Sequence, residues 1–235
     1  MSEHARSASA SRSDFWDLDG KRAVLHTGRL QGVVDLTQPL RGLTAVFVDG
    51  QAQSGWLMGV DVASAETRGV SKDQPWDIAD IYIRGRDLVA TYREPLEQPF
   101  NLQLYWRVVD LLDGVAAIDL ICSIQTPLWE AHPSVSVCSS MFNTPAAVVG
   151  DSLTSSNDGP LTYLEVTRRG DFEPSAPKGQ GEFPGAFWRF GPQFMEKGVI
   201  RRLQLRGAFV PSDTAAHDAG RLAQQLAAEE PALTA

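Results

Sequence analysis

The fold is decided by residues 78–124, which read IADIYIRGRDLVATYREPLEQPFNLQLYWRVVDLLDGVAAIDLICSI. Polar and apolar residues alternate through several short runs in this stretch, and glycine-containing turns separate the runs. Alternation with a period of two is typical of strands that bury one side and expose the other. We therefore expect antiparallel strands whose exposed side offers a platform for a ligand.

Two turns set the order of these strands. Residues 84–87, Arg-Gly-Arg-Asp, are expected to close a first hairpin, and Asp113-Gly114 a second one. Asp-Gly favours the positive backbone angles of a tight hairpin. Between them, Pro95 and Pro99 indicate a loop, because proline cannot donate to a strand ladder. The stretch therefore predicts a meander of four antiparallel strands.

The remainder of the chain continues the same rhythm of short apolar runs bounded by Gly, Pro, Asp or Asn. Residues 1–13 lack periodic apolar positions and predict a disordered tail. Residues 169–185 contain several prolines and glycines and predict a long surface loop, whose role the sequence leaves open. We expect one β-sandwich domain over residues 14–235.

One helix is expected, at residues 213–230. Ser212 is placed to cap it, and a stripe of apolar residues follows at spacings of three and four. The stripe consists of Ala216, Ala219, Leu222, Ala223 and Leu226. The expected fold class is therefore all-β, an antiparallel sandwich with one C-terminal helix that docks on the sheet.

Composition narrows the classes of partner. The chain has 235 residues, 43% of them apolar, and 29 acidic against 21 basic residues give a net charge of −8. This charge opposes attraction to nucleic acid or anionic lipid. The N-terminus lacks the apolar run of a secretory signal, and no apolar stretch is long enough for a spanning helix. Cys122 and Cys138 are expected to be reduced core thiols in a cytoplasmic protein.

The exposed side of the predicted meander is the first candidate site. Strand alternation assigns to it three aromatic side chains together with arginine and amide groups: Tyr82, Arg84, Tyr92, Gln103, Tyr105 and Arg107. Aromatic rings and forked donors suit a sugar, which packs its C–H face on a ring and hydrogen-bonds through its hydroxyls. The alternative is a solvated sheet face held by cross-strand pairs.

The second candidate site lies in a loop after this meander. Trp129, Glu130 and His132 stand close together there, and Trp129 could line a ligand cleft. An imidazole exchanges protons near neutral pH, and a carboxylate either acts as a base or orients it. The alternative is a structural or solvent-exposed His132. No metal-ligand cluster, phosphate loop, nucleophile elbow or dinucleotide fingerprint is found, so we expect no cofactor or metal.

The many antiparallel strands, the polar and aromatic face and the late segment Phe-Met-Glu-Lys-Gly-Val-Ile-Arg-Arg at residues 194–202 resemble the β-supersandwich of the galactose mutarotase-like superfamily. In that superfamily sugars bind a concave sheet face, and the aldose epimerases use a histidine as acid and a later glutamate as base. The resemblance implies that His132 protonates the ring oxygen while Glu196 takes the anomeric proton. The sequence around His132, Ala-His-Pro-Ser, departs from an epimerase histidine motif.

Three functions follow as hypotheses. The first is a protein that binds a carbohydrate or polyol on the aromatic and arginine-bearing face. The second is a sugar epimerase or other carbohydrate-active enzyme that uses His132 with Glu130 or Glu196. The third is a non-catalytic protein in which an exposed strand face or the helix mediates oligomerisation.

Overall fold

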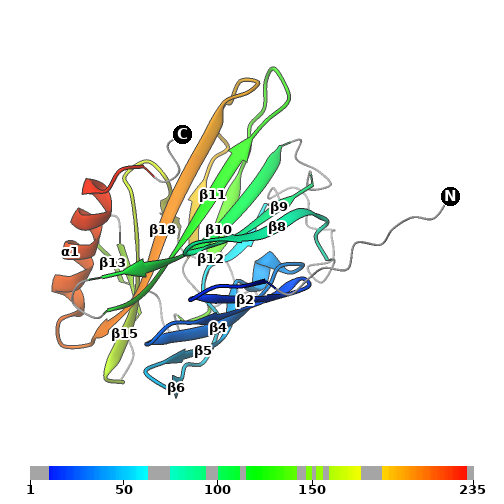
Figure 1. Ribbon diagram of the computed structural model, residues 1–235. Helices are drawn as coiled ribbons and strands as arrows, with labels where there is room; N and C mark the ends of the chain where they lie inside the picture. The colour runs from blue at the N-terminus through cyan, green and yellow to red at the C-terminus, as the bar shows by residue number, and fades with distance from the viewer. Residues whose placement is uncertain are drawn as a thin grey trace.

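A computed structural model describes most of the chain as antiparallel strands in three sheets (Figure 1). The described residues are 11–62, 75–93, 100–111, 115–141, 147–149, 152–155, 159–175 and 187–231. The Asp113-Gly114 turn, Pro95, Pro99 and part of the predicted 169–185 loop lie outside them. The expected all-β sandwich with one C-terminal helix is confirmed.

The N-terminal part forms a six-stranded meander in the order β1-β2-β3-β4-β5-β6. Its strands are β1 (Ser11–Arg12), β2 (Trp16–Asp19), β3 (Arg22–His26), β4 (Leu30–Asp35), β5 (Leu43–Val48) and β6 (Gln51–Ala52). A short 3-10 helix, η1 (Pro39–Arg41), separates β4 from β5. Because Ser11 and Arg12 pair with β2, the predicted disordered tail extends too far by at least these residues.

The largest sheet has eight strands in the order β13-β14-β15-β18-β11-β10-β9-β8. They are β8 (Ile78–Arg84), β9 (Asp87–Tyr92), β10 (Asn101–Asp110), β11 (Ala116–Gln125), β13 (Ala147–Val149), β14 (Ser152–Thr154), β15 (Leu161–Thr167) and β18 (Ile200–Pro211). The predicted four-strand meander is confirmed as β8 to β11. Its first turn is also confirmed, since Arg84 pairs with Asp87 and Gly85 has a φ of 59°.

The third sheet has the order β16-β17-β12-β7 and consists of β7 (Gly59–Asp61), β12 (Val135–Cys138), β16 (Glu173–Ser175) and β17 (Phe187–Phe190). Strand β16 lies within the stretch predicted as an irregular loop. That prediction is wrong for residues 173–175, which pair with β17. Pro174 lies in the edge strand of this sheet, the position in which a strand tolerates proline.

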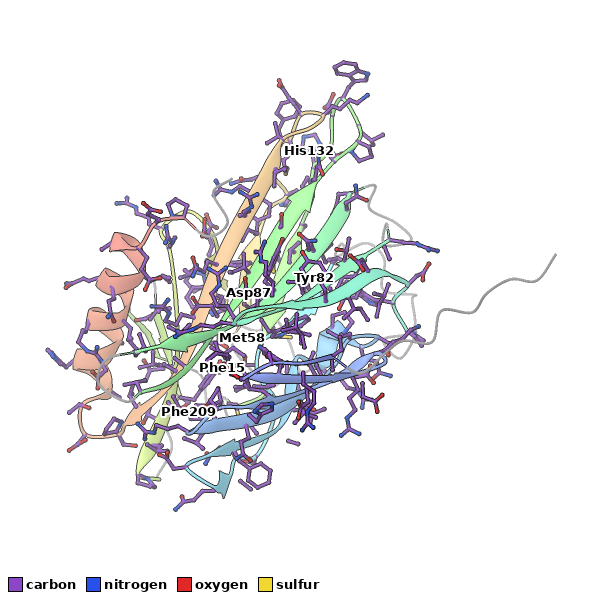
Figure 2. All side chains as sticks on the ribbon, in the orientation of Figure 1. Phe15, Met58, Tyr82, Asp87, His132 and Phe209 are labelled. Carbon is purple, nitrogen blue, oxygen red and sulfur yellow. The ribbon has the colours of Figure 1, made fainter. Side chains whose placement is uncertain are left out.

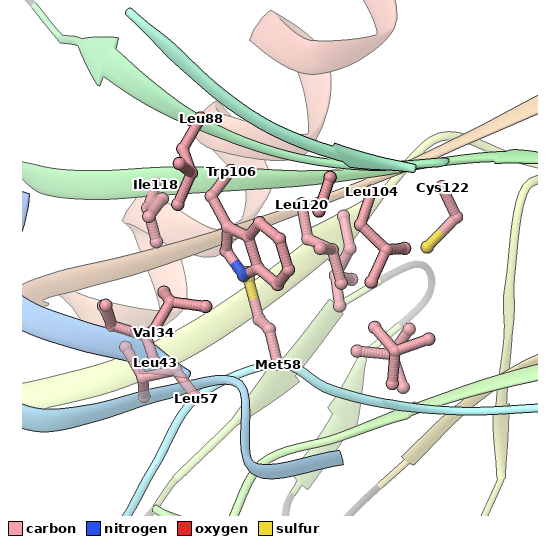
Figure 3. Packing of buried hydrophobic residues seen from close by; sticks show 14 of the residues in the cluster. Val34, Leu43, Leu57, Met58, Leu88, Leu104, Trp106, Ile118, Leu120 and Cys122 are labelled. Carbon is pink, nitrogen blue, oxygen red and sulfur yellow. The ribbon is translucent and has the colours of Figure 1, made fainter. Parts of the chain in front are cut away.

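One core joins the three sheets. Figure 3 shows Trp106 and Leu120 of the eight-stranded sheet facing Val34 and Leu43 of the N-terminal sheet. Trp188 of β17 belongs to the same buried cluster. We call the face of the eight-stranded sheet that carries Trp106 the inner face, and the opposite one the outer face. Cys122 and Cys138 are buried and are not joined by a disulfide, as the sequence predicts.

The single described α-helix, α1 (Ala215–Ala228), packs on the outer face over β14, β15 and β18. Its buried stripe contains Ala219, Leu222 and Leu226 as expected, but Ala215 takes the place predicted for Ala216. The N-cap is Thr214, because the Ser212 hydroxyl donates instead to Gly159. Within the described residues, no helix is long and apolar enough to cross a bilayer.

Candidate functional site on the outer sheet face

Strand register arranges the outer face into three rows that cross β8, β9, β10, β11 and β18. The charged row contains Arg84, Asp87, Arg107, Asp119 and Arg206. The aromatic row contains Tyr82, Val89, Tyr105, Ile121 and Gln204. The polar row contains Asp80, Thr91, Gln103, Ser123 and Arg202. Helix α1 covers the β14–β15–β18 side of the face and leaves β8 and β9 uncovered by helix (Figure 1).

The charged row alternates in sign from strand to strand. Ion pairs join Arg84 and Arg107 to Asp87, and Arg206 to Asp119. The Arg107 guanidinium donates to both Asp87 oxygens, at 2.7 and 2.9 Å. The hydrogen bond to Asp87 raises the pKa of Arg107. Arg206 donates to both Asp119 oxygens at the same two distances, and both side chains are 1% exposed. The charged row is therefore a ladder of paired charges that ties strands together.

The ladder ends on the C-terminal helix. Arg206 also donates to both carboxylate oxygens of Glu229, at 2.8 and 2.9 Å. Glu229 is the C-cap residue of α1, and the Arg168 guanidinium donates to its backbone carbonyl at 2.8 Å. Because Arg206 is held on two sides by carboxylates, it has a structural role and is not available to a ligand.

The aromatic row offers one accessible ring. Tyr105 is only 7% exposed and packs against Val89, Ile121 and Tyr82. Burial raises the pKa of its hydroxyl, which donates to the Gln103 amide oxygen. Gln103 in turn donates to Thr91 at 2.8 Å. Tyr82 is only partly buried, so a ligand bound on this row would contact the Tyr82 ring. Tyr105 packs against the Tyr82 ring.

The structure separates the six residues that the sequence assigned to this face. Figure 2 labels Tyr82 and Asp87 on β8 and β9, and Arg84, Gln103, Tyr105 and Arg107 share their face. Tyr92 does not, and its assignment is wrong. It pairs with Leu102, lies 1% exposed on the inner face and donates to the Leu36 carbonyl at 2.9 Å. Because Arg84 pairs with Asp87, even residues of β8 share a face with odd residues of β9.

The second candidate site lies at the far end of the eight-stranded sheet. Residues 126–134 and 191–200 form two neighbouring loops, which we call the tip. They are joined by backbone hydrogen bonds between Ala131 and Met195, at 2.8 and 3.1 Å. This bridge places Glu130 opposite Glu196 and His132 opposite Phe194. The structure thus brings together the two segments that carry the predicted acid and base candidates.

Most side chains of the tip are exposed, and its side-chain contacts involve aromatic rings. Trp129 is 81% exposed, and the Lys197 ammonium lies 5.0 Å from the centre of its ring. The rings of His132 and Phe194 are 5.8 Å apart. Figure 2 shows His132 at this end of the molecule. Among the described residues, no ion pair joins His132 to Glu130 or Glu196.

A third polar cluster, which the sequence analysis did not predict, lies in the interior. Glu165 of β15 is fully buried and accepts hydrogen bonds from the Ser139 hydroxyl at 2.5 Å, the Tyr163 hydroxyl at 2.7 Å and the Trp188 indole at 2.8 Å. Burial raises the pKa of the Glu165 carboxyl. Since Trp188 belongs to β17, the cluster links the eight-stranded sheet to the four-stranded one.

The acidic partners on the outer face were also missed. Asp87 directly follows the first hairpin turn, so the turn prediction already implied that Asp87 pairs with Arg84. Asp119 can be assigned as a partner only when the register of β11 and β18 is known. Within the described residues, no group of three or more His, Cys, Asp or Glu side chains is placed to hold a metal ion.

Comparison with known proteins supports the fold. No protein-family model and no curated protein sequence matches the chain. Its structure is similar to that of a mutant heparan sulfate lyase HepC from Pedobacter heparinus, with a TM-score of 0.52 at 10% identity. The match covers 86% of this chain and 37% of the lyase. A second HepC structure from that organism matches 83% of this chain with a TM-score of 0.49 and 10% identity. The chain thus spans little more than a third of the lyase.

Proposed function

We propose that this chain is a carbohydrate- or polyol-binding β-sandwich that binds its ligand on the outer face, beside Tyr82. The observation that carries the proposal is the partly exposed Tyr82 ring between a polar row and a charged row. A sugar presents an apolar C–H face and a rim of hydroxyls, which match a ring flanked by donors and acceptors. The fold shared with a heparan sulfate lyase agrees with this ligand class.

The residues divide into two roles under this proposal. Tyr82, Arg84 and Gln103 contact the ligand, because Tyr82 and Gln103 are partly exposed and Arg84 has a side chain 58% exposed. Tyr105 and Arg107 position them, since Tyr105 is mostly buried and Arg107 is held by Asp87. Loss of a positioning residue weakens binding because the side chains that contact the ligand shift. It removes no direct contact with the ligand.

Calorimetric titration of the protein with a panel of neutral saccharides tests this assignment. Tyr82→Ala should weaken binding of a ligand found in the panel about tenfold, the effect of losing about 1.4 kcal/mol of stacking energy. Phe47→Ala is the matched control, because Phe47 is 39% exposed on β5 of a different sheet. If the Tyr82→Ala variant and the unmodified protein bind the ligand with equal affinity, the ligand does not bind beside Tyr82 on the outer face.

The tip supports a second candidate function, an epimerase of the galactose mutarotase-like kind. The bridge between Ala131 and Met195 favours it, because it brings His132 beside the segment that carries Glu196. In this function His132 is the acid and Glu196 the base that open the sugar ring, with Glu130 beside them. Nuclear magnetic resonance can follow interconversion of the two anomers of an aldose. His132→Ala should abolish any acceleration of this interconversion by the protein. If the variant still accelerates the interconversion, His132 has no part in the mechanism.

A further inference from the structure

Within the part of the chain that the structure describes, Arg202 differs from the other outer-face arginines because its side chain forms no hydrogen bond or ion pair. In the charged row, Arg84 and Arg107 are paired with Asp87, and Arg206 with Asp119. Arg202 lies on the same face in the polar row, and no group of the described residues accepts a hydrogen bond from its buried Nε atom. The side chain is partly exposed, so a ligand can approach its guanidinium. A free guanidinium is unusual in a chain with 29 acidic and 21 basic residues.

A second unpartnered group lies beside it. Gln204 is two residues further along β18 on the same face and is 4% exposed. Its amide nitrogen donates to Asp119 at 2.6 Å, but its amide oxygen receives no hydrogen bond from the described residues. A buried acceptor without a donor is unfavourable by about 1–3 kcal/mol. Arg202 thus lies beside a buried acceptor whose hydrogen-bonding capacity is unmet in the described residues.

The neighbours of Arg202 complete a polar surface. Ser123 of β11 is paired with Arg202 across the strands, and Gln103 of β10 is paired with Ser123. The Arg202 charge also acts on the hydroxyl of Tyr105 in the adjacent row. A guanidinium with a hydroxyl beside it binds a carboxylate or a sulfate. Arg202 and Ser123 together therefore suit a ligand that carries an oxyanion.

We propose that Arg202 binds the carboxylate or sulfate group of an acidic oligosaccharide, with Ser123 beside it. The saccharide chain runs across β11, β10 and β9 toward Tyr82 on β8, a span of about 19 Å that takes several sugar rings. This assignment rests on the proposed saccharide function and narrows its substrate class. It gives Arg202 the role of a specificity residue, since a neutral sugar leaves the guanidinium without a partner. Specificity of this kind is a difference between two affinities, so it is measured with matched ligands.

The experiment compares two oligosaccharides of the same backbone and length, one neutral and one carrying a carboxylate or sulfate, by calorimetry. The charged ligand should bind at least about tenfold more tightly, and Arg202→Gln should remove this preference while leaving the neutral ligand unaffected. Arg189→Gln is the matched control, because Arg189 is an exposed arginine of β17 on another sheet. It should change neither affinity.

The outcomes separate the two proposals. If the unmodified protein binds neither oligosaccharide, the saccharide function fails and the Arg202 assignment with it. If it binds both and Arg202→Gln weakens neither, only the Arg202 assignment fails. Inorganic sulfate is a third ligand in the same titrations. If it occupies Arg202 as tightly as the charged oligosaccharide does, the site binds simple anions and the assignment to a saccharide is overturned.

Discussion

Glu165 carries a titratable carboxyl group that is completely buried. It is fully buried on the inner face, and its three hydrogen-bond donors come from neutral groups on Ser139, Tyr163 and Trp188. No cation lies among these partners to offset the desolvation of a carboxylate, so the neutral acid is favoured. The sequence could not reveal this residue, because Glu165 resembles any polar position in an alternating strand.

This environment predicts a stability that depends on pH. Because the folded pKa of Glu165 is raised, the folded state holds one proton more than the unfolded state between the ordinary glutamate pKa and the raised one. The free energy of unfolding should therefore fall as pH rises through this window, by up to about 1.4 kcal/mol per pH unit from this residue. Urea denaturation at a series of pH values measures the slope.

Glu165→Gln keeps the shape of the side chain and cannot ionise, so its unfolding free energy should show a smaller slope than that of the unmodified protein. Glu173→Gln is the control, because Glu173 is exposed on β16. Asp171 also has a pKa raised by burial, but it contributes equally to all three proteins. Identical slopes for the Glu165→Gln variant and the unmodified protein would show that Glu165 is not the buried neutral acid.

At the scale of elements, strand register explains both what the sequence predicted and what it missed. The turn predicted at Arg84–Asp87 placed β8 and β9 in the correct register. A two-residue turn at Asp113-Gly114 would instead pair Arg107 with Leu120, whereas the observed partner is Asp119. This shift of one residue decides whether an acid or an apolar side chain lies beside Arg107. The charged row could not be predicted without it.

The ion pairs of the charged row should contribute very unequally to the free energy of unfolding. Arg206→Met leaves the buried Asp119 without its cation and should lower the free energy of unfolding by about 3–5 kcal/mol. Arg84→Ala removes a 3.5 Å contact at the exposed end and should cost about 1 kcal/mol or less. Chemical denaturation of both variants measures the difference. Similar losses at the two ends would contradict a ladder whose strength follows burial.

Two glycines provide a matched pair of alanine substitutions. A Cβ on Gly207 of β18 would lie 2.4 Å from the Tyr163 hydroxyl and 2.6 Å from the Met58 methyl, so Gly207→Ala should destabilise the protein by about 1–3 kcal/mol. A Cβ on Gly220 of α1 would meet nothing within 4 Å. Gly220→Ala should therefore stabilise the helix by about 0.5–1 kcal/mol. Thermal unfolding distinguishes the two, and a shared sign would contradict the close packing at Gly207.

At the scale of the whole molecule, two surfaces compete for function. The outer face carries the charged, aromatic and polar rows and is only partly covered by α1, whereas the tip carries most of the exposed large apolar side chains of the described residues. Those at the tip are Leu128, Trp129, Phe194, Val199 and Ile200. The sequence nominated both surfaces, through strand alternation and through the residues near His132. It could not rank them, because exposure depends on which loops meet at the end of the sheet.

The central claim is that a saccharide binds the outer face. Hydrogen–deuterium exchange of the free and saccharide-saturated protein tests it most directly, because exchange reports each strand separately. Binding on the outer face predicts slower exchange in β8, β9 and β10, with residues 126–134 and 191–200 unchanged. Protection confined to those two segments of the tip, with β8 to β10 unaffected, would contradict the claim.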